Sequence, residues 1–238
     1  GNVGLSTQGQ GLTLVYIDST QGWRSVQDNV FDAAGSNYVA ATGGTITTCG
    51  DWKIHTFTSP GTFTVTAAGS PAGSNTADYL VVAGGGGGGG GAPGNPSGGG
   101  GGGGGFRESS PAPGTDWTDS PKGNPGGALP VSIQAYPITV GAGGALGNRL
   151  SGSNSIFSTI TSAGGGGGGK PSFLCGGAGG SGGGAGANGG TLCISGGSGN
   201  TPPVSPPQGT DGGTNGGGGP GAQGDNTGGG GGATENGQ

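Results

Sequence analysis

Two runs of eight glycines, at 84–91 and 98–105, constrain the fold of this chain more than any other feature. Ordering a glycine backbone costs more conformational entropy than ordering any other residue, and glycine has no side chain to bury. Such runs therefore either remain a flexible coil or form helices of the polyproline-II type. These helices have no internal hydrogen bonds, so their backbone groups must find partners on neighbouring helices that approach closely.

The position of the glycines favours packed helices over linkers. Only 12 of the 72 glycines lie in the first 80 residues. The apolar segments 78–83, 136–140 and 155–163 each run directly into glycine, which anchors one end of the run. We therefore predict an all-β framework with a polyglycine-II helix bundle and no α-helix. The residues expected to bound its glycine rods are Gly84, Gly91, Gly98, Gly105, Gly164 and Gly169.

Alternating apolar and polar residues predict further strands before the first glycine run. Residues 12–17 and 23–28 flank the turn sequence DSTQG and predict a β-hairpin. The sequence FTSPGTFTV, at 57–65, predicts a second hairpin around Pro60-Gly61. We expect four regions: 1–31 as the end of an upstream β module or shaft, 32–38 as a connector, 39–165 as the β framework with inserted glycine runs, and 166–238 as a glycine-rich polyglycine-II and loop region.

Composition argues against several classes of function. The net charge is −5 with only six Lys and Arg, whereas nucleic-acid binding needs a basic patch. There is no run of 18 apolar residues and no visible signal peptide, and we expect no membrane insertion. We expect no metal or other cofactor, because the single His55 is predicted to face solvent or a neighbouring subunit and the three cysteines are scattered. Cys175 and Cys193 are a candidate disulfide, with Cys49 left over.

Catalytic patterns are also absent from the sequence. No serine has a histidine partner in a recognisable arrangement, and nothing indicates a glycosidase. No Gly-Lys-Ser/Thr follows the glycine runs, so they are not phosphate-binding loops. We expect a protein that is not an enzyme.

Several motifs resemble the glycine-rich domain found in bacteriophage tail-fibre and other virion proteins. They are GGTITTCGDWKIHTFTSPGTFTV, DYLVVAGGGGGGG, YPITVGAGG and NSIFSTITSAGGGGGG. The upstream LTLVYIDSTQGWRSV resembles the closing segment of a β module that often precedes this domain. The resemblance covers most of residues 1–169, and the tail from Lys170 is similar in composition only.

The resemblance implies a non-enzymatic structural or adhesion protein of the virion, as a tail fibre or fibre tip. In architecture the chain also resembles the receptor-binding adhesins of T-even-type phages, in which stacked polyglycine helices display loops to the host. The implied localisation is the virion, outside the cell. The implied partners are a homotrimer or other virion subunits, and a glycan or outer-membrane protein of the host. No binding residue is carried over from these adhesins.

The segments between the glycine runs are the candidates for receptor contact. The longest, 106–130, contains about a third of the charged residues and is expected to be held out from the β framework by the rods before it. An aromatic ring flanked by carboxylates suits a sugar or a protein surface, although the alternative is a solvated loop with its Trp folded back. The candidate residues are Phe106, Arg107, Asp116, Trp117, Asp119, Lys122 and Phe173, and lesser candidate segments are 146–150, 170–174 and 201–208.

Two other functions remain open from the sequence. One is a purely structural subunit that decorates a capsid or forms filaments without a receptor. The other is an ice-binding protein, since glycine-rich bundles present flat and regular faces.

Overall fold

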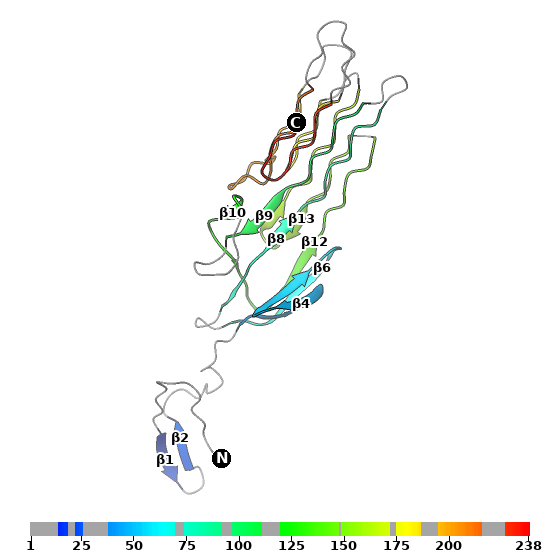
Figure 1. Cartoon of the computed structure of the whole chain (residues 1–238). Coiled ribbons are helices and arrows are strands. Elements are labelled where there is room, and N and C mark those ends of the chain that lie inside the picture. The colour runs from blue at the N-terminus through cyan, green and yellow to red at the C-terminus, as the bar shows by residue number, and fades with distance from the viewer. Residues whose placement is uncertain are drawn as a thin grey trace, which may run out of the picture.

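A computed structural model describes residues 14–18, 22–25, 38–69, 74–91, 97–110, 120–147, 149–171, 175–186, 195–215 and 227–238. In Figure 1 short β-sheets form a base, and extended glycine-rich segments run from it side by side. There is no helix in these residues, as predicted. The strands are β1 (Leu14–Asp18), β2 (Gly22–Ser25), β3 (Ala40–Thr42), β4 (Thr45–Cys49), β5 (Trp52–Thr56), β6 (Gly61–Ala67), β7 (Thr76–Ala77), β8 (Leu80–Val82), β9 (Phe106–Ser109), β10 (Gly123–Asn124), β11 (Leu129–Pro130), β12 (Ala135–Thr139), β13 (Ser155–Phe157) and β14 (Ile160–Ser162).

Two sheets position the glycine segments. A five-stranded antiparallel sheet has the order β14-β13-β12-β6-β3, and a three-stranded sheet has the order β10-β9-β8. Strands β8 and β9 pair antiparallel, and β8 also contacts β13 and β14. The remaining strands form the two-stranded pairs β11-β7, β4-β5 and β1-β2. The β1–β2 pair, with Tyr16 opposite Trp23, confirms the first predicted hairpin.

Aromatic rings make the core of the base. Phe63 on β6, Tyr136 on β12 and Phe157 on β13 are all buried. The ring of Phe157 packs edge-on against the other two, with centroid distances of 5.8 Å to Phe63 and 6.0 Å to Tyr136. Val65, 1% exposed, and Val81 from β8 belong to the same cluster, so the core joins the two sheets. Burial of these side chains is the main apolar stabilisation of the base.

The glycine segments continue the strands. Strand β8 leads into 84–91, and 97–105 returns to β9. The N–H of Gly86 donates to the carbonyl of Gly102, and that of Gly89 to Gly99, each at 2.8 Å. The two long runs are therefore antiparallel, although residues 92–96 lie outside the described part of the chain. In the same way β12 leads into 141–147, 149–154 leads into β13, and β14 leads into 163–170.

The C-terminal part adds glycine segments without adding strands. We use the name glycine segments for the following set: 84–91, 97–105, 141–147, 149–154, 163–170, 175–180, 181–186, 195–200, 209–215, 227–232 and 235–238. They bond laterally, on both sides of the predicted boundary at residue 165. The N–H groups of Gly166 and Gly169, for example, donate to the carbonyls of Ser181 and Gly184 at 2.9 and 2.8 Å.

Bonding with a period of three residues identifies the helix type. Gly84 and Gly87 donate to one neighbour, and Gly86 and Gly89 donate to another. A period of three is that of the polyproline-II helix. No glycine in 84–91 has a positive φ, which agrees with this helix. The run 98–105 departs from it only at Gly104, where φ is 90°.

Segment 181–186 lies at the centre of the bundle. Every residue in it is buried, including Ser181 and Ala185. It bonds to six other segments, namely 97–105, 163–170, 175–180, 195–200, 209–215 and 227–232. Lateral bonds on all sides offset the entropic cost that would leave a single run disordered.

Close backbone approach explains why these positions are glycine. A Cβ on Gly166 would lie 1.8 Å from the carbonyl oxygen of Gly177, and a Cβ on Gly182 would lie 1.8 Å from that of Gly197. No side chain fits at such distances. The structure therefore supports the packed helices over the linker interpretation.

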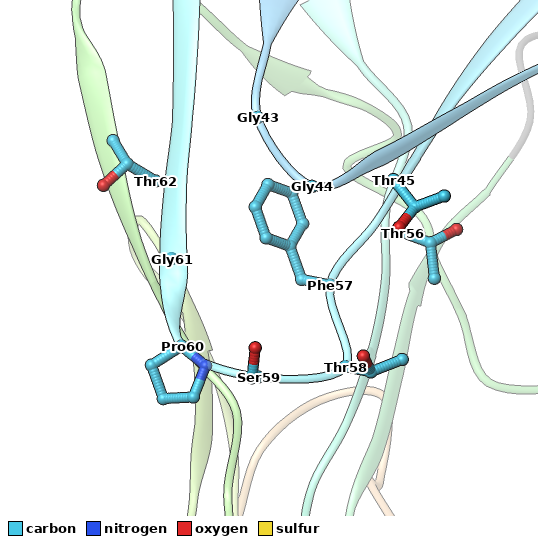
Figure 2. A pocket seen from close by; sticks show the side chains of 10 residues that line it. All are labelled: Gly43, Gly44, Thr45, Thr56, Phe57, Thr58, Ser59, Pro60, Gly61 and Thr62. Atoms are coloured by element: carbon cyan, nitrogen blue, oxygen red, sulfur yellow. The ribbon is translucent and has the colours of Figure 1, made fainter.

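The predicted hairpin around Pro60-Gly61 is wrong. Strand β5 pairs with β4, whereas β6 pairs with β12 and β3. The ring of Phe57 occupies the space between the two strands, beside Gly43, Gly44 and Gly61 (Figure 2). The turn at Gly50, with φ of 56°, instead joins β4 and β5 as the hairpin.

Two further predictions need correction. Residues 155–163 form the β13–β14 hairpin rather than one strand, because Ser158 has a φ of 53° and reverses the chain. His55, predicted to face solvent or a neighbouring subunit, is half-buried and contacts residues of its own chain. Its Nδ1 lies 2.8 Å from the carbonyl oxygen of Gly43, and its ring stands edge-on to Phe63 at 5.1 Å.

Candidate functional site

The chain that follows the second glycine run lies in the base, not beyond the rods. Because 97–105 runs back toward the sheets, Phe106 and Arg107 belong to β9, paired with Val82 and Val81 of β8. The prediction that the segment 106–130 is held out from the framework is therefore wrong for 106–110 and 120–130, and residues 111–119 lie outside the described part of the chain. The Phe106 and Arg107 side chains are both half-buried, and Arg107 Nη1 donates to the carbonyl of Thr161 at 3.4 Å.

Polar side chains next to these residues hold the base together. The buried Glu108 accepts a hydrogen bond of 2.7 Å from the N–H of Ser120. Ser109, fully buried, donates to Asp78 at 2.8 Å. Lys122 is half-buried, and its N–H donates to the Ser120 hydroxyl at 3.1 Å. These hydrogen bonds fasten the segment to the sheet. Glu108 and Ser109 therefore have a structural role.

Several predicted residues cannot be placed. Asp116, Trp117, Asp119, Phe173 and Cys193 lie outside the described residues. Cys175 is disulfide-bonded, and Cys49 is free and exposed. The pairing of Cys175 with Cys193 remains a prediction, since Cys193 is one of the residues that the structure does not describe.

At the end nearest the sheets, the bundle is anchored by two buried polar side chains that the sequence analysis did not single out. Gln208, 1% exposed, accepts a hydrogen bond from the N–H of Ala163 at 2.8 Å and donates to the carbonyl of Pro202 at 2.9 Å. The Ser181 hydroxyl contacts the carbonyl oxygens of Gly104 and Gly232 at 2.7 and 2.9 Å. No sequence pattern marks a single Gln or Ser for such a role.

Several glycine segments end or begin at the far end of the bundle, away from the sheets. The last and first described residues of consecutive segments there are Gly91 and Ser97, Pro171 and Cys175, Gly186 and Ser195, and Asn215 and Thr227. Asn215 is buried there, and its side-chain amide donates to the carbonyl of Gly186 at 3.1 Å. Arg149 reaches the carbonyl of Gly176 at 3.4 Å. Side-chain amides and guanidinium groups therefore tie neighbouring segments together near their ends.

Two of the stretches between these residues, which the structure does not describe, differ in composition from the glycine segments. Residues 172–174 read SFL and residues 187–194 read ANGGTLCI, so both stretches contain apolar residues between glycine segments. The candidate Phe173 belongs to this group by its sequence neighbours Pro171 and Cys175.

No reactive group is assembled in the described part of the chain. No three His, Cys, Asp or Glu residues there lie close enough to hold a metal ion. The shallow pocket around Phe57 in Figure 2 is lined by Gly, Thr, Ser and Pro, with no charged side chain. Among the same residues, no helix is long and apolar enough to cross a membrane.

Comparison with known families agrees with this architecture. The model of a glycine-rich domain matches residues 58–238, which is most of the chain. The chain belongs to this glycine-rich domain family. The match begins in the turn between β5 and β6 and includes every glycine segment. No curated protein matches the chain, and no solved structure matches it.

Proposed function

We propose that this glycine-rich protein is a non-enzymatic adhesion protein of a virion, a phage tail fibre or fibre-tip component that presents its far-end segments to the host surface. The observation that carries the proposal is the separation of roles along the bundle. Glycines fill most of the interior, where the backbones approach too closely for most side chains, while the described residues that flank the apolar stretches 172–174 and 187–194 lie at the end away from the sheets. Such segments resemble the loops that adhesins display on stacked polyglycine helices.

A glycan or an outer-membrane protein is the proposed host partner. Aromatic and branched apolar side chains next to small polar ones, as in SFL and TLCIS, suit contact with either. The proposed location of the protein is the virion surface. On this proposal Phe173 takes the contact role, and Phe106 and Arg107 contribute to the base.

Cell binding tests this function. The fluorescently labelled chain would be added to a panel of bacterial strains, with binding measured by flow cytometry. The double variant Leu192→Ser/Ile194→Ser, and Phe173→Ala, are expected to reduce binding at least tenfold. A control, Thr47→Ser on the exposed strand β4, and Trp117→Ala are expected to leave it unchanged.

The alternative readings predict different results. No binding to any strain, together with filaments or capsid decoration under negative stain, would favour a purely structural subunit. Loss of binding in Trp117→Ala but not in the far-end variants would return the contact to the 106–130 segment.

A further inference from the structure

One side of the bundle is a single layer of glycine segments. In order across it lie 141–147, 84–91, 97–105, 227–232 and 235–238, which we call the glycine face. Each bonds to the next: Gly144 to Gly85, Gly86 to Gly102, Gly100 to Gly228, and Gly229 to Gln238. Behind this layer lie 149–154, 163–170, 181–186 and 209–215, which bond to it from one side only. No other described segment covers the opposite side.

Three positions on this face, Gly88, Gly103 and Gly143, are glycine although the chain itself leaves room for a side chain. A Cβ on Gly88 would lie 3.8 Å from its nearest neighbour, the Gly99 carbonyl oxygen. A Cβ on Gly103 or Gly143 would lie 3.6 Å away from the nearest atom. None of the three has a positive φ. Neither steric crowding nor backbone conformation within one chain requires glycine there, and glycine costs entropy.

The opposite side of the same bundle is built differently. Its exposed positions carry side chains, and they recur at the same period of three. They are Ala178, Ser195, Ser198, Asp211 and Thr214. A solvent-facing polyglycine segment in this protein therefore accepts side chains, which Gly88, Gly103 and Gly143 lack although there is room for them.

The glycine face also presents backbone groups in the pattern used inside the bundle. Among the described residues, nothing accepts a hydrogen bond from the N–H of Gly85 or Gly88, and nothing donates to the carbonyls of Gly86 or Gly89. These groups repeat every three residues, like the paired groups on the inner side. A partner that hydrogen-bonds to these N–H groups and carbonyls needs backbone groups at the same three-residue spacing. It also needs positions without side chains at the contact, so that the two backbones can approach.

We propose that the glycine face is the contact surface for a second copy of this chain. A second copy supplies the required backbone spacing from its own glycine face. When the same surface of both copies forms the interface, the result is a closed dimer with twofold symmetry. Leu146, which is 84% exposed, lies beside Gly88 on this face, and a partner would cover it. With a rise of about 3.1 Å per residue and a spacing near 4.8 Å between segments, two copies would bury about 1,000 Å² in total, which reaches the minimum expected of a biological interface.

Sedimentation equilibrium of the full chain over a concentration series tests this contact. The wild type is expected at twice the chain mass of 21.7 kDa. Gly88→Asn and Gly103→Asn are expected to be monomers with an unchanged circular dichroism spectrum, because the new side chains point away from their own bundle. The control Ser198→Asn, on the opposite side, is expected to remain a dimer. A monomeric wild type, or Asn variants that remain dimeric, would overturn the proposal.

Hydrogen exchange gives a second test without any substitution. The amides of Gly85 and Gly88 are expected to exchange at least tenfold more slowly in concentrated than in dilute protein, while the amide of Gly86 is protected in both. Equal exchange at both concentrations would contradict the contact. Thermal hysteresis from a monomeric wild type would indicate that the glycine face binds ice. That result would also overturn the proposed contact between two copies.

Discussion

The side-chain carbonyl of Gln208 accepts a hydrogen bond of 2.8 Å from the backbone N–H of Ala163, where β14 turns into a glycine segment. The backbone carbonyl of the same Gln208 accepts from the N–H of Phe106 at 2.8 Å, where another glycine segment enters β9. One residue from the C-terminal part of the chain thus fastens two junctions between sheet and bundle.

Removal of this side chain is expected to destabilise the protein. Gln208→Ala leaves the buried N–H of Ala163 without an acceptor, at a cost of about 1–3 kcal/mol. Urea unfolding measures the change. Ser205→Ala, an exposed position in the same loop, is the control and should lie within about 0.5 kcal/mol of the wild type. Equal stabilities for the two variants would show that the junction does not depend on Gln208.

Adjacent glycines in one run are expected to respond in opposite ways to alanine. A Cβ on Gly102 would lie 2.2 Å from the Ser181 carbonyl oxygen, whereas a Cβ on Gly103 would lie 3.6 Å from its nearest neighbour. Gly102→Ala should therefore cost at least about 1–3 kcal/mol, as overpacking does. Gly103→Ala should be neutral or slightly stabilising, by up to about 1 kcal/mol. Thermal unfolding in dilute solution compares them, and similar melting temperatures would contradict the packed bundle.

The side chain of Ser181 is expected to contribute more to the free energy of unfolding than that of any exposed serine of the bundle. Its hydroxyl contacts the carbonyls of Gly104 and Gly232 and is fully buried. Ser181→Ala should lose about 1–2 kcal/mol of unfolding free energy, as typical for lost buried hydrogen bonds. Ser198→Ala, at an exposed position on the outer side, should change little. A denaturation midpoint that shifts equally in both variants would argue against the central position of 181–186.

Thiol labelling distinguishes the cysteines. A maleimide reagent added to the native, unreduced protein is expected to modify one thiol, that of the free and exposed Cys49, and Cys49→Ser should abolish the modification. A disulfide-linked peptide containing Cys175 and Cys193 should appear in a digest of the unreduced protein. Labelling of Cys175 without a reductant would contradict its bonded state.

The glycine rods were the most predictable part of the fold. Eight consecutive residues without side chains leave few ordered conformations, and the apolar segments before them predicted where the rods begin. Strand β8 and the glycine runs 84–91 and 97–105 follow from this reasoning. The glycine-rich tail was predicted only as a region, because its runs are short and have no strand to anchor them.

Strand partners were less predictable than strands. FTSPGTFTV has the residues of a hairpin, yet β5 and β6 join different sheets because Phe57 packs against Gly43 and Gly44. That contact depends on the three-dimensional approach of distant residues, which turn propensity does not describe. The place of Phe106 was also not predictable from local sequence. Because 97–105 returns antiparallel to 84–91, Phe106 lies in the base.

The amino-acid sequence by itself determined that the chain is a β framework with side-chain-free rods, since nothing else accommodates such glycine runs in order. Only the tertiary structure decided which rods are neighbours and which glycines face outward. The physical reason is that every glycine looks alike in a sequence. A Cβ at Gly102 meets a carbonyl oxygen at 2.2 Å and one at Gly103 meets nothing within 3.6 Å, and that difference arises only from the packing of segments far apart in the chain.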